Sequence, residues 1–305
     1  MLNFKEISRY GFGAIVLEKD NTVWVDPNDF LSLLDICTQE LGINYIDSAS
    51  GYGDSEKYLG QWLKSSQVSR DRLLIGSKVS SQNLTSDFVV TAIENSLKQT
   101  QLEYFDIYWV HKFKGNTPLE EGISGFAKAI ESGKIRGYGI CNTTTKELSQ
   151  LMKICQQHSL PKPMFIQNMF SLATQDQTNL DVLDFCEQHQ LIFTCASPLA
   201  GGILTGKYQL EGELPENSRW KHWGKTRGLP EYWNQRTFDG IEKLKSIAGE
   251  LDVSLTALSL AWARDHQLIN CTLIGPRNPS QLNAVKESSK ISLTAEQVKS
   301  IGHLF

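Results

Sequence analysis

Four side chains that can exchange or orient protons stand at the ends of short apolar runs. Asp47 and Tyr52 lie in YIDSASGYG, Lys78 closes LLIGSKV and His111 closes IYWVH. A charged group that ends an apolar run is costly to bury without a partner. Asp47 and Lys78 could pair, and a cation beside a tyrosine lowers the pKa of its phenol. A tyrosine tuned in this way, with a histidine donor nearby, could give a proton to a carbonyl oxygen.

A single lysine or histidine at a strand end more often satisfies its neighbours structurally than takes part in catalysis. Four such groups at the ends of consecutive predicted strands favour the catalytic interpretation. That interpretation requires elements that bring the four groups to one place.

Eight short β-rich runs alternate with longer segments of helical periodicity. Segments such as FLSLLDICTQELG and DVLDFCEQHQ carry apolar residues at i, i+3 and i+4. Strands that alternate with helices predict parallel pairing through right-handed crossovers. The predicted strands are Arg9–Ile15, Ile43–Ala49, Arg72–Val79, Phe105–Lys112, Ile135–Asn142, Met164–Met169, Leu191–Leu199 and Cys271–Pro276.

Eight β–α units in 305 residues predict an α/β protein, a (β/α)8 TIM barrel that forms a single domain over residues 1–305. An open doubly wound sheet is the alternative. Active sites of such barrels form at the carboxyl ends of the strands, where the four polar groups are predicted. The segment Tyr208–Leu251, rich in Pro, Gly and Trp, is predicted to be a long insertion between strands seven and eight.

The composition argues against several classes of protein. The net charge of −4 argues against a nucleic-acid partner, which would need clustered Lys and Arg. The densest basic stretch, RWKHWGKTR, is interpreted as a solvated loop or the edge of a substrate pocket. No run approaches the ~18 apolar residues of a membrane span, and the N-terminal residues lack the apolar core of a signal peptide. A cytoplasmic protein without membrane contact is expected.

The cysteines are scattered singly through apolar runs. They form no C-x-x-C pair, and no histidine stands at ligand spacing from them, so they indicate reduced core residues rather than a disulfide framework or a zinc site. No metal is expected. The six are Cys37, Cys141, Cys155, Cys186, Cys195 and Cys271.

Several motifs together resemble those of the aldo-keto reductase family, almost end to end, from RYGFG to GPRNPSQL. The family's D-T-A-x-x-Y-G signature has its counterpart in DSASGYG at residues 47–53, and its strand-three lysine in Lys78. Its D-x-Y-x-x-H motif corresponds to DIYWVH at residues 106–111, and GKIRGYGICN resembles its G-K-I-R-x-x-G-x-S-N. Four motifs in the right order on the right elements make the resemblance specific.

The resemblance implies a (β/α)8 barrel that binds NADPH or NADH and transfers a hydride to or from a carbonyl carbon. Tyr52 would be the general acid that protonates the carbonyl oxygen. Lys78, held by Asp47, would tune Tyr52, and His111 would hydrogen-bond the same oxygen. The cofactor would supply the redox chemistry, and the protein the geometry and electrostatics.

The resemblance also assigns cofactor contacts. Two side-chain amides, which offer donor and acceptor together, would hold the nicotinamide carboxamide. The run SPLAGGILTGKY resembles the pyrophosphate-side loop, where glycines let the backbone approach the phosphates. Arg277 would partner a 2′-phosphate, which favours NADPH over NADH. The implied contacts are Gly13, Asn142, Gln167, Ser197, Leu199, Gly201, Leu204, Lys207, Gly275, Arg277 and Gln281.

Two positions depart from the family pattern. Cys141 stands where the family usually has Ser before Asn142, and a thiol is the weaker hydrogen-bonding partner. Ala196 stands where many members have an aromatic ring that stacks on the nicotinamide. Some sugar-dehydrogenating relatives also carry a small residue there, so the direction of the reaction stays open.

Tryptophans are candidates for the wall of a pocket that takes an apolar or ring-shaped carbonyl compound. Trp24 and Trp109 are the expected substrate contacts, ahead of Trp220, Trp223 and Trp233. The main hypothesis is an NADPH-dependent reductase of a small aldehyde or ketone. The alternatives are an NAD(P)-dependent sugar or alcohol dehydrogenase and a cofactor-binding regulatory subunit with little turnover. The family resemblance implies a monomer.

Overall fold

The computed structural model contains all eight predicted strands, each inside its predicted run. The description of the structure covers most of the chain. It comprises residues 2–14, 25–79, 84–112, 118–216, 218–221, 224 and 228–305.

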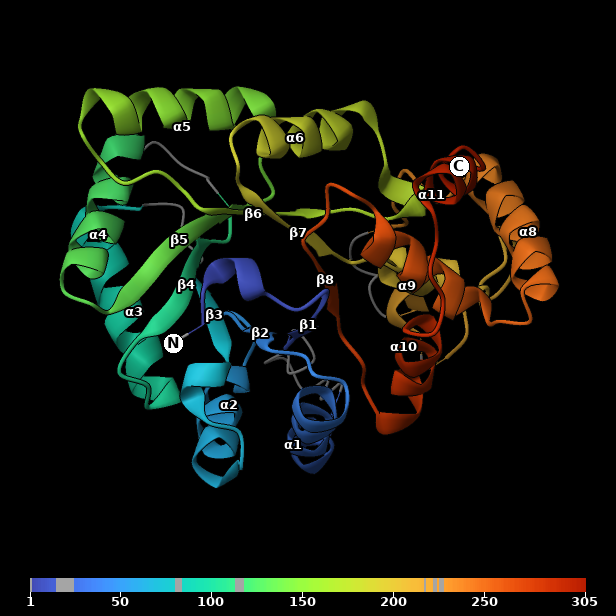
Figure 1. Ribbon diagram of the computed structural model, residues 1–305, viewed down its shortest axis with the longest axis horizontal. Helices are drawn as coiled ribbons and strands as arrows, with labels where there is room; N and C mark the ends of the chain where they lie inside the picture. Colours follow the sequence, from blue (N-terminus) through green and yellow to red (C-terminus); the bar gives the residue numbers. More distant parts are fainter. Residues whose placement is uncertain are drawn as a thin grey trace.

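The strands close into one parallel barrel in chain order, because β8 pairs with β1 as well as with β7 (Figure 1). The predicted (β/α)8 TIM barrel is therefore confirmed, and the open sheet was the wrong alternative. The strands are β1 Tyr10–Gly13, β2 Tyr45–Asp47, β3 Leu74–Val79, β4 Phe105–Val110, β5 Ile135–Cys141, β6 Phe165–Met169, β7 Ile192–Ala196 and β8 Cys271–Ile274.

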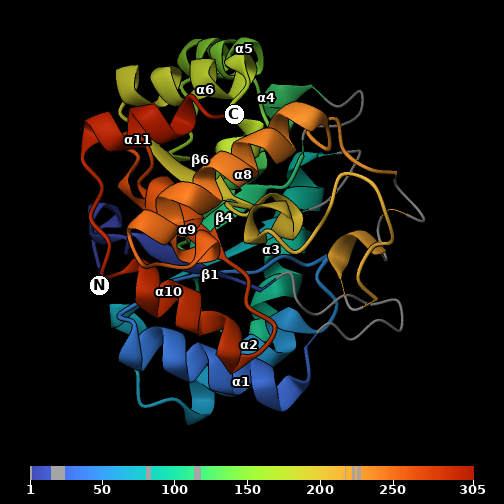
Figure 2. The ribbon, with the colours of Figure 1, turned by 90° about the vertical axis from the view of Figure 1, so that its right-hand side faces the viewer.

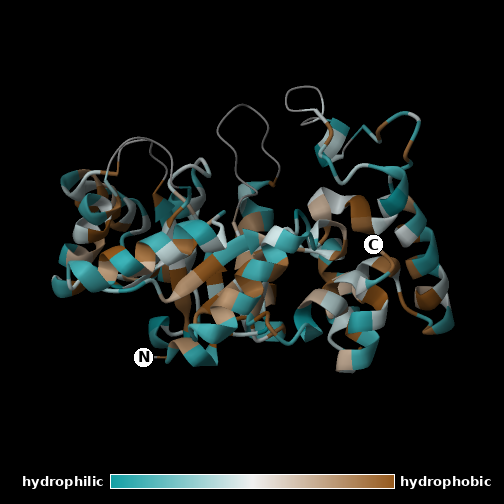
Figure 3. Cartoon of the chain, turned by 90° about the horizontal axis from the view of Figure 1, so that it is seen from above, coloured by the Kyte–Doolittle hydropathy of each residue, from teal (hydrophilic) through white to brown (hydrophobic). Residues whose placement is uncertain are grey.

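Helices surround the strands, with hydrophobic residues gathered toward the interior and largely hydrophilic outer faces (Figures 1 and 3). The α-helices are α1 Pro27–Asp35, α2 Ser55–Ser65, α3 Ser86–Thr100, α4 Leu119–Glu131, α5 Thr145–Gln157, α6 Gln177–Gln188, α8 Gln235–Glu250, α9 Leu255–Asp265, α10 Leu282–Ser288 and α11 Ala295–Gly302. Shorter helical turns are η1 Phe4–Glu6, η2 Ile36–Glu40, η3 Arg70–Arg72, η4 Leu172–Thr174, η5 Ala200–Thr205 and η6 Pro279–Gln281.

Helix α5 shows how the sequence defines such an element. Thr144 caps its first turn by accepting from the backbone N–H of Glu147, whose carboxylate accepts from the Thr144 N–H in return. Leu148, Leu151 and Cys155 recur at helical spacing and are buried. The apolar stripe therefore fixes which face of α5 packs on the barrel.

Side chains of each strand alternate between the helix layer and the barrel interior. In β4, Tyr108 and Val110 belong to the large core beneath the helices, whereas Ile107 and Trp109 belong to a second cluster inside the barrel. Trp109 is completely buried there and packs edge-on against Phe165 at 5.9 Å between ring centroids. Trp109, expected as a substrate contact, therefore lies in the packed interior of the barrel, and a role in substrate binding stays a prediction.

The amino end of the barrel is closed by a buried ion-pair group. Asp106, at the start of β4, accepts from Arg136 at 2.6 Å and from Arg70 at 2.7 Å. The backbone N–H of Ile75 donates to the same carboxylate at 2.8 Å. The guanidinium of Arg136 also lies over the ring of Phe4, 4.6 Å from its centroid. These contacts tie the N-terminal segment, β3, β4 and β5 together.

The chain between β7 and β8 contains η5, α8 and α9. Figure 2 shows the segment that precedes α8, drawn in yellow, on the side of the barrel opposite the N-terminus. Aromatic rings anchor this segment: Trp233 lies 5.2 Å from Tyr208 and 5.3 Å from Phe238 between centroids. The indole N–H of Trp233 donates to the carbonyl of Leu210. Part of the predicted insertion is thus ordered around a small aromatic core.

All six cysteines are free thiols and buried, as the sequence predicted. Burial raises the pKa of the Cys37 and Cys186 thiols to about 12. Among the described residues, no group of three or more His, Cys, Asp or Glu side chains could hold a metal ion. In the same part of the chain, no helix is long and apolar enough to cross a membrane.

Candidate active site

The Asp47 carboxylate lies at the carboxyl end of β2, and both of its oxygens accept hydrogen bonds. The Lys78 ammonium, from β3, forms a buried ion pair with Oδ2, and Gln167 Nε2 donates to the same oxygen at 3.3 Å. Tyr45 donates its phenolic proton to Oδ1 at 2.7 Å. Lys78 also donates to the carbonyl oxygen of Ser48 at 2.9 Å. The predicted pairing of Asp47 with Lys78 is therefore present, within a larger hydrogen-bonded group.

Tyr52 and His111 face this ion pair. The Lys78 ammonium lies 5.0 Å from the centroid of the Tyr52 ring. The ring of His111 meets the Tyr52 ring edge-on, with 5.7 Å between centroids. The structure thus brings together all four polar groups that the sequence places at strand ends.

The pKa of Tyr52 does not shift in the expected direction. Burial raises the pKa of Tyr52 above its ordinary value, and the positive charge of Lys78 lowers it only in part. Desolvation by burial is the largest single influence on the pKa of Lys78 and acts to lower it, but the interactions with Asp47, Tyr52 and Cys141 together outweigh it, so this pKa is also raised. In the absence of ligand, Tyr52 is therefore a neutral proton donor beside a permanently charged ammonium.

His111 is neutral at physiological pH. Burial and the nearby Lys78 charge lower the pKa of His111 from 6.5 to about 4. A neutral imidazole carries one N–H donor and one acceptor nitrogen. His111 can therefore donate a hydrogen bond without delivering a net charge to the site.

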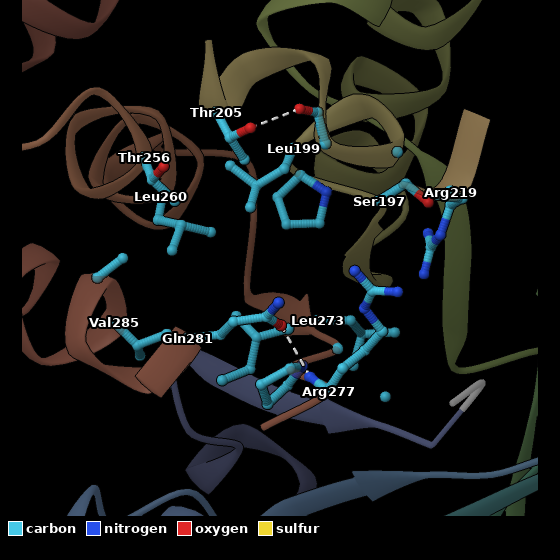
Figure 4. A pocket seen from close by; sticks show the side chains of 18 of the residues that line it. Ser197, Leu199, Thr205, Arg219, Thr256, Leu260, Leu273, Arg277, Gln281 and Val285 are labelled. Atoms are coloured by element: carbon cyan, nitrogen blue, oxygen red, sulfur yellow. Dashed lines mark hydrogen bonds between the residues drawn. The ribbon is translucent and has the colours of Figure 1, made fainter. Parts of the chain in front are cut away.

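Asp47 and Tyr52 border a cavity of about 360 Å³ at the carboxyl ends of the strands. Asp47, Tyr52 and Gln167 line it together with η5, α9 and the segment that follows β8. Figure 4 shows the part of the lining that comes from these three segments, with Thr205, Thr256 and Arg277 among the labelled residues. The volume is in the range of ligand sites, which run from ~300 to ~1,000 Å³. The cavity therefore joins the proton-donating groups to residues far along the chain.

Three cations line the same cavity. Lys207 follows η5, Arg219 comes from the segment before α8, and Arg277 follows β8. Burial lowers the pKa of Lys207, and the charges of Arg277 and Arg219 lower it further. Figure 4 shows the side chains of Arg219 and Arg277 reaching into one space from opposite segments. Of the described residues that line the cavity, Asp47 is the single acid, so its cationic part suits a multiply charged anion such as a dinucleotide.

Most of the expected cofactor contacts meet in this cavity, and two do not. Asn142 is exposed, and its amide donates to the carbonyl of His111 at 3.0 Å. Leu204 is wholly buried in the core and does not line the cavity, so its assignment as a cofactor contact stays a prediction. The expected residues that line the cavity are Gly13, Gln167, Ser197, Leu199, Gly201, Lys207, Gly275, Arg277 and Gln281.

Position 201 requires glycine because the ring of Trp220 approaches its backbone closely. Its φ of +67° lies in the left-handed region, and a Cβ there would stand 2.8 Å from Nε1 of Trp220. Trp220 is buried beside it. The segment that carries Arg219 is thereby packed directly on η5, next to the cavity.

The expected aromatic contacts that the structure describes, Trp109, Trp220 and Trp233, do not line this cavity. Trp24 and Trp223 lie outside the described residues, and Trp109 is buried in the barrel interior. Ala196 does line the cavity, and in the sheet it stands beside Met169 of β6, which is 40% exposed.

Sequence reasoning missed lining residues in two places, the segment before α8 and helix α9. Arg219 lies in the basic stretch that was interpreted as a solvated loop or pocket edge, and its lysine- and arginine-rich neighbourhood was the available signal. Thr256 and Leu260 come from α9, whose sequence shows only an ordinary amphipathic pattern. Their place at the cavity follows from tertiary packing.

A parallel eight-stranded barrel with proton-donating groups at the carboxyl ends of its strands has the arrangement in which (β/α)8 enzymes place their active sites. Residues 10–304 match the model of the aldo/keto reductase family, so the chain belongs to that family. It is accordingly an NAD(P)H-dependent oxidoreductase, and such enzymes reduce carbonyl compounds.

Named relatives agree with the family assignment. The chain is 26% identical over 292 residues to a probable voltage-gated potassium channel subunit beta of Oryza sativa subsp. japonica, covering 90% of this chain and 85% of that protein. It is 27% identical over 278 residues to L-glyceraldehyde 3-phosphate reductase of Escherichia coli O157:H7, covering 86% and 80%. A crystal structure of a thermostable aldo-keto reductase with the inhibitor epalrestat superposes with a TM-score of 0.74 at 22% identity, covering 98% and 96%. This structural likeness shows the shared fold.

Proposed function

We propose that the protein is an NADPH-dependent reductase that converts an aldehyde or ketone to an alcohol, with Tyr52 as general acid. One observation carries the proposal: a single cavity is lined by Tyr52 and Asp47 and by the cations Lys207, Arg219 and Arg277. The first pair suits a carbonyl oxygen that must be protonated, and the cations suit the phosphates of a dinucleotide.

The reaction needs a proton at the carbonyl oxygen while a hydride reaches the carbon, and NADPH supplies that hydride when it is bound. Tyr52 gives its phenolic proton to the oxygen. The ammonium of Lys78, 5.0 Å from the ring centroid, stabilises the phenolate that forms. Asp47 keeps Lys78 charged and in place through their ion pair.

His111 would orient the substrate. Its lowered pKa of about 4 leaves the imidazole neutral, so it can donate one hydrogen bond to the carbonyl oxygen. It therefore does not compete with Tyr52 as the source of the proton. Its edge-on contact with the Tyr52 ring holds both groups at the same place.

Gln167 would hold the nicotinamide carboxamide. Its Nε2 donates to Asp47 and its Oε1 accepts from the Cys141 thiol at 3.7 Å. Both ends of the amide are therefore oriented before any ligand binds. Cys141 takes part in this orientation despite its departure from the family's usual serine.

Arg277 would select NADPH over NADH. Its backbone N–H donates to Oε1 of Gln281 at 2.8 Å, and both residues line the cavity (Figure 4). A guanidinium meets a phosphate with paired, charge-assisted hydrogen bonds. Lys207 and Arg219 would meet the pyrophosphate.

The named relatives favour a second candidate, a regulatory subunit that binds cofactor and turns over little, since one of them is a channel subunit beta. The intact group of Asp47, Lys78, Tyr52 and His111 favours turnover. An oxidative dehydrogenase would use the same groups in reverse, with Tyr52 accepting the proton. The direction of turnover distinguishes that variant from the reductase.

The first test is a titration of the protein with NADPH and with NADH, followed by quenching of tryptophan fluorescence. NADPH is expected to bind at least ~10-fold more tightly, because only NADPH carries the 2′-phosphate. Equal binding would overturn the role of Arg277, and binding of neither would overturn the proposal.

Turnover is tested next, as NADPH oxidation with a panel of small aldehydes and ketones. The Tyr52→Phe variant is expected to lose ~10²- to 10⁴-fold in kcat while it binds NADPH as before. Equal turnover in both proteins would contradict the general-acid role. Tight NADPH binding without turnover on any substrate would favour the regulatory subunit.

A further inference from the structure

A chain of buried hydrogen bonds continues below Asp47 into the barrel interior. Trp109 donates its indole N–H to the Tyr45 oxygen at 3.1 Å, and Tyr45 donates its proton to Oδ1 of Asp47 at 2.7 Å. Tyr45 and Trp109 are both completely buried. The chain runs from β4 to β2 and ends at the carboxylate that binds Lys78.

Glycines leave room for this chain of hydrogen bonds to cross β3. Gly76 lies between the two strands, and a Cβ there would stand 3.0 Å from Nε1 of Trp109 and 3.1 Å from the Tyr45 oxygen. On β5, a Cβ at Gly139 would stand 2.5 Å from the Trp109 ring. Side chains at either position would displace the donor or the ring. The space in which the indole reaches Tyr45 therefore depends on two glycines.

The direction of the two hydrogen bonds is fixed by chemistry. An indole N–H can only donate, so the Tyr45 oxygen must accept from Trp109. The phenolic proton is then available to the carboxylate, which can only accept. Tyr45 thus places a positive dipole end against the Asp47 oxygen that Lys78 does not bind.

We propose that Tyr45, held by Trp109, is a positioning residue that orients Asp47 and moderates its charge, and so controls how strongly Lys78 acts on the Tyr52 phenol. The inference rests on the proposed function for its effect on turnover. Its effect on the proton affinity of Tyr52 is independent of turnover.

The expected direction follows from the groups that surround Tyr52. Tyr52 is faced by Lys78 from β3, Asp47 from β2, Cys141 from β5 and His111 after β4. The Lys78 charge favours the phenolate, and the Asp47 charge opposes it. Removing the Tyr45 dipole strengthens the field of Asp47, so the phenol of Tyr52 should hold its proton more tightly.

The variant that tests this is Tyr45→Phe, which removes one buried oxygen. Tyr138→Phe is the matched control, because Tyr138 is a buried tyrosine that donates to the carbonyl of Pro161 at 2.8 Å, away from the cavity. Tyr45→Phe removes the hydrogen bonds of the Tyr45 oxygen to Trp109 and Asp47, and Tyr138→Phe removes those of the Tyr138 oxygen to Pro161 and Cys155. Each variant thus loses two hydrogen bonds, so general destabilisation should be similar. Only Tyr45→Phe should change the titration of Tyr52.

The titration is measured by NMR of protein labelled at the tyrosine Cζ carbons, with the Tyr52 signal assigned by its loss in Tyr52→Phe. The pKa of Tyr52 should rise by about half a unit or more in Tyr45→Phe and stay unchanged in Tyr138→Phe. Equal titration in wild type and Tyr45→Phe, or an equal shift in the control, would overturn the inference.

Turnover gives a second readout. In the reductive direction, where Tyr52 must hold its proton, the alkaline limb of kcat against pH should move up by the same amount in Tyr45→Phe, with little change in the substrate KM. Trp109→Phe alone should move this limb by less. Adding Trp109→Phe to Tyr45→Phe should move it no further than Tyr45→Phe does alone. A wild type without turnover would count against the proposed function, while the NMR titration would still decide the role of Tyr45.

Discussion

The barrel carries a buried carboxylate paired with a cation near each of its two ends, and the two groups behave differently. At the amino end, Asp106 is wholly buried, whereas its partners Arg70 and Arg136 keep about a quarter of their side chains exposed, at 24% and 22%. At the carboxyl end, the side chains of Lys78 and Asp47 are 0% and 3% exposed. The amino-end cations reach solvent, and the carboxyl-end cation faces a titratable phenol.

The two carboxylates differ in what their hydrogen-bonding partners contact in turn. The partners of Asp106 connect β3, β4, β5 and the N-terminal segment, so its hydrogen bonds end in scaffold. The partners of Asp47 are Lys78, Tyr45 and Gln167, and two of these lead to Tyr52 or to the cavity wall. A buried ion pair is weak evidence for stability or for catalysis until its neighbours are known.

The largest effect is expected from Lys78→Met at the carboxyl end. Without the ammonium, the phenolate of Tyr52 loses its stabilising charge, and kcat should fall ~10³-fold, about 4 kcal/mol in activation free energy. Steady-state NADPH oxidation measures this. The matched change at the other end, Arg136→Met, should leave kcat within about twofold, and a comparable loss there would abolish the distinction between the two ends.

Asp106→Asn should act on stability instead. Two guanidinium groups would face a neutral amide, and breaking a buried pair in this way costs about 3 kcal/mol of unfolding free energy. Urea denaturation followed by circular dichroism measures the loss. The kcat of the folded fraction should be unchanged, and a specific loss of turnover at full folding would show that the amino end also serves catalysis.

Within the carboxyl end, Arg277→Met separates cofactor binding from proton donation. Loss of the guanidinium should raise the Kd for NADPH by about 30-fold, roughly 2 kcal/mol, while the Kd for NADH stays the same. Fluorescence titration compares the two cofactors. An equal change for both would assign Arg277 to a contact that the cofactors share.

The smallest effect concerns His111 and pH. Its folded pKa of about 4 is below its ordinary 6.5, so the unfolded chain binds more protons between these values and stability falls as pH drops through that window. Since part of the ring meets solvent, about 1 kcal/mol is expected between pH 6.5 and 4. Urea unfolding at several pH values should show a smaller decline in His111→Asn, and an identical decline would remove His111 as the cause.

The barrel could be predicted because the sequence patterns that indicate its strands and helices are local. Each strand is a short apolar run, and parallel pairing follows from the alternation with helices. Asp47, Tyr52, Lys78 and His111 were found because strand ends of a barrel converge on one face. The roles of these four residues stay predictions until the variants above are measured.

Tertiary packing decided what the sequence patterns could not predict. The alternation of side chains along β4 predicts that Trp109 points into the barrel. Whether an inward-pointing ring contacts ligand or core depends on how deep in the barrel it lies. The direction of the Tyr52 pKa shift depends on how burial weighs against the Lys78 charge, which no motif encodes. Arg219 reaches the cavity because Trp220 packs on Gly201, a contact between segments that sequence spacing does not reveal.

The burial of every native thiol has a practical consequence. With six free cysteines inaccessible, the folded surface offers maleimide reagents no native attachment point. A single exposed cysteine, for example Glu231→Cys beside the aromatic anchor of the segment before α8, would carry one dye per molecule without any native cysteine being replaced. Single-molecule or stopped-flow fluorescence could then follow the Arg219 segment while dinucleotide enters and leaves.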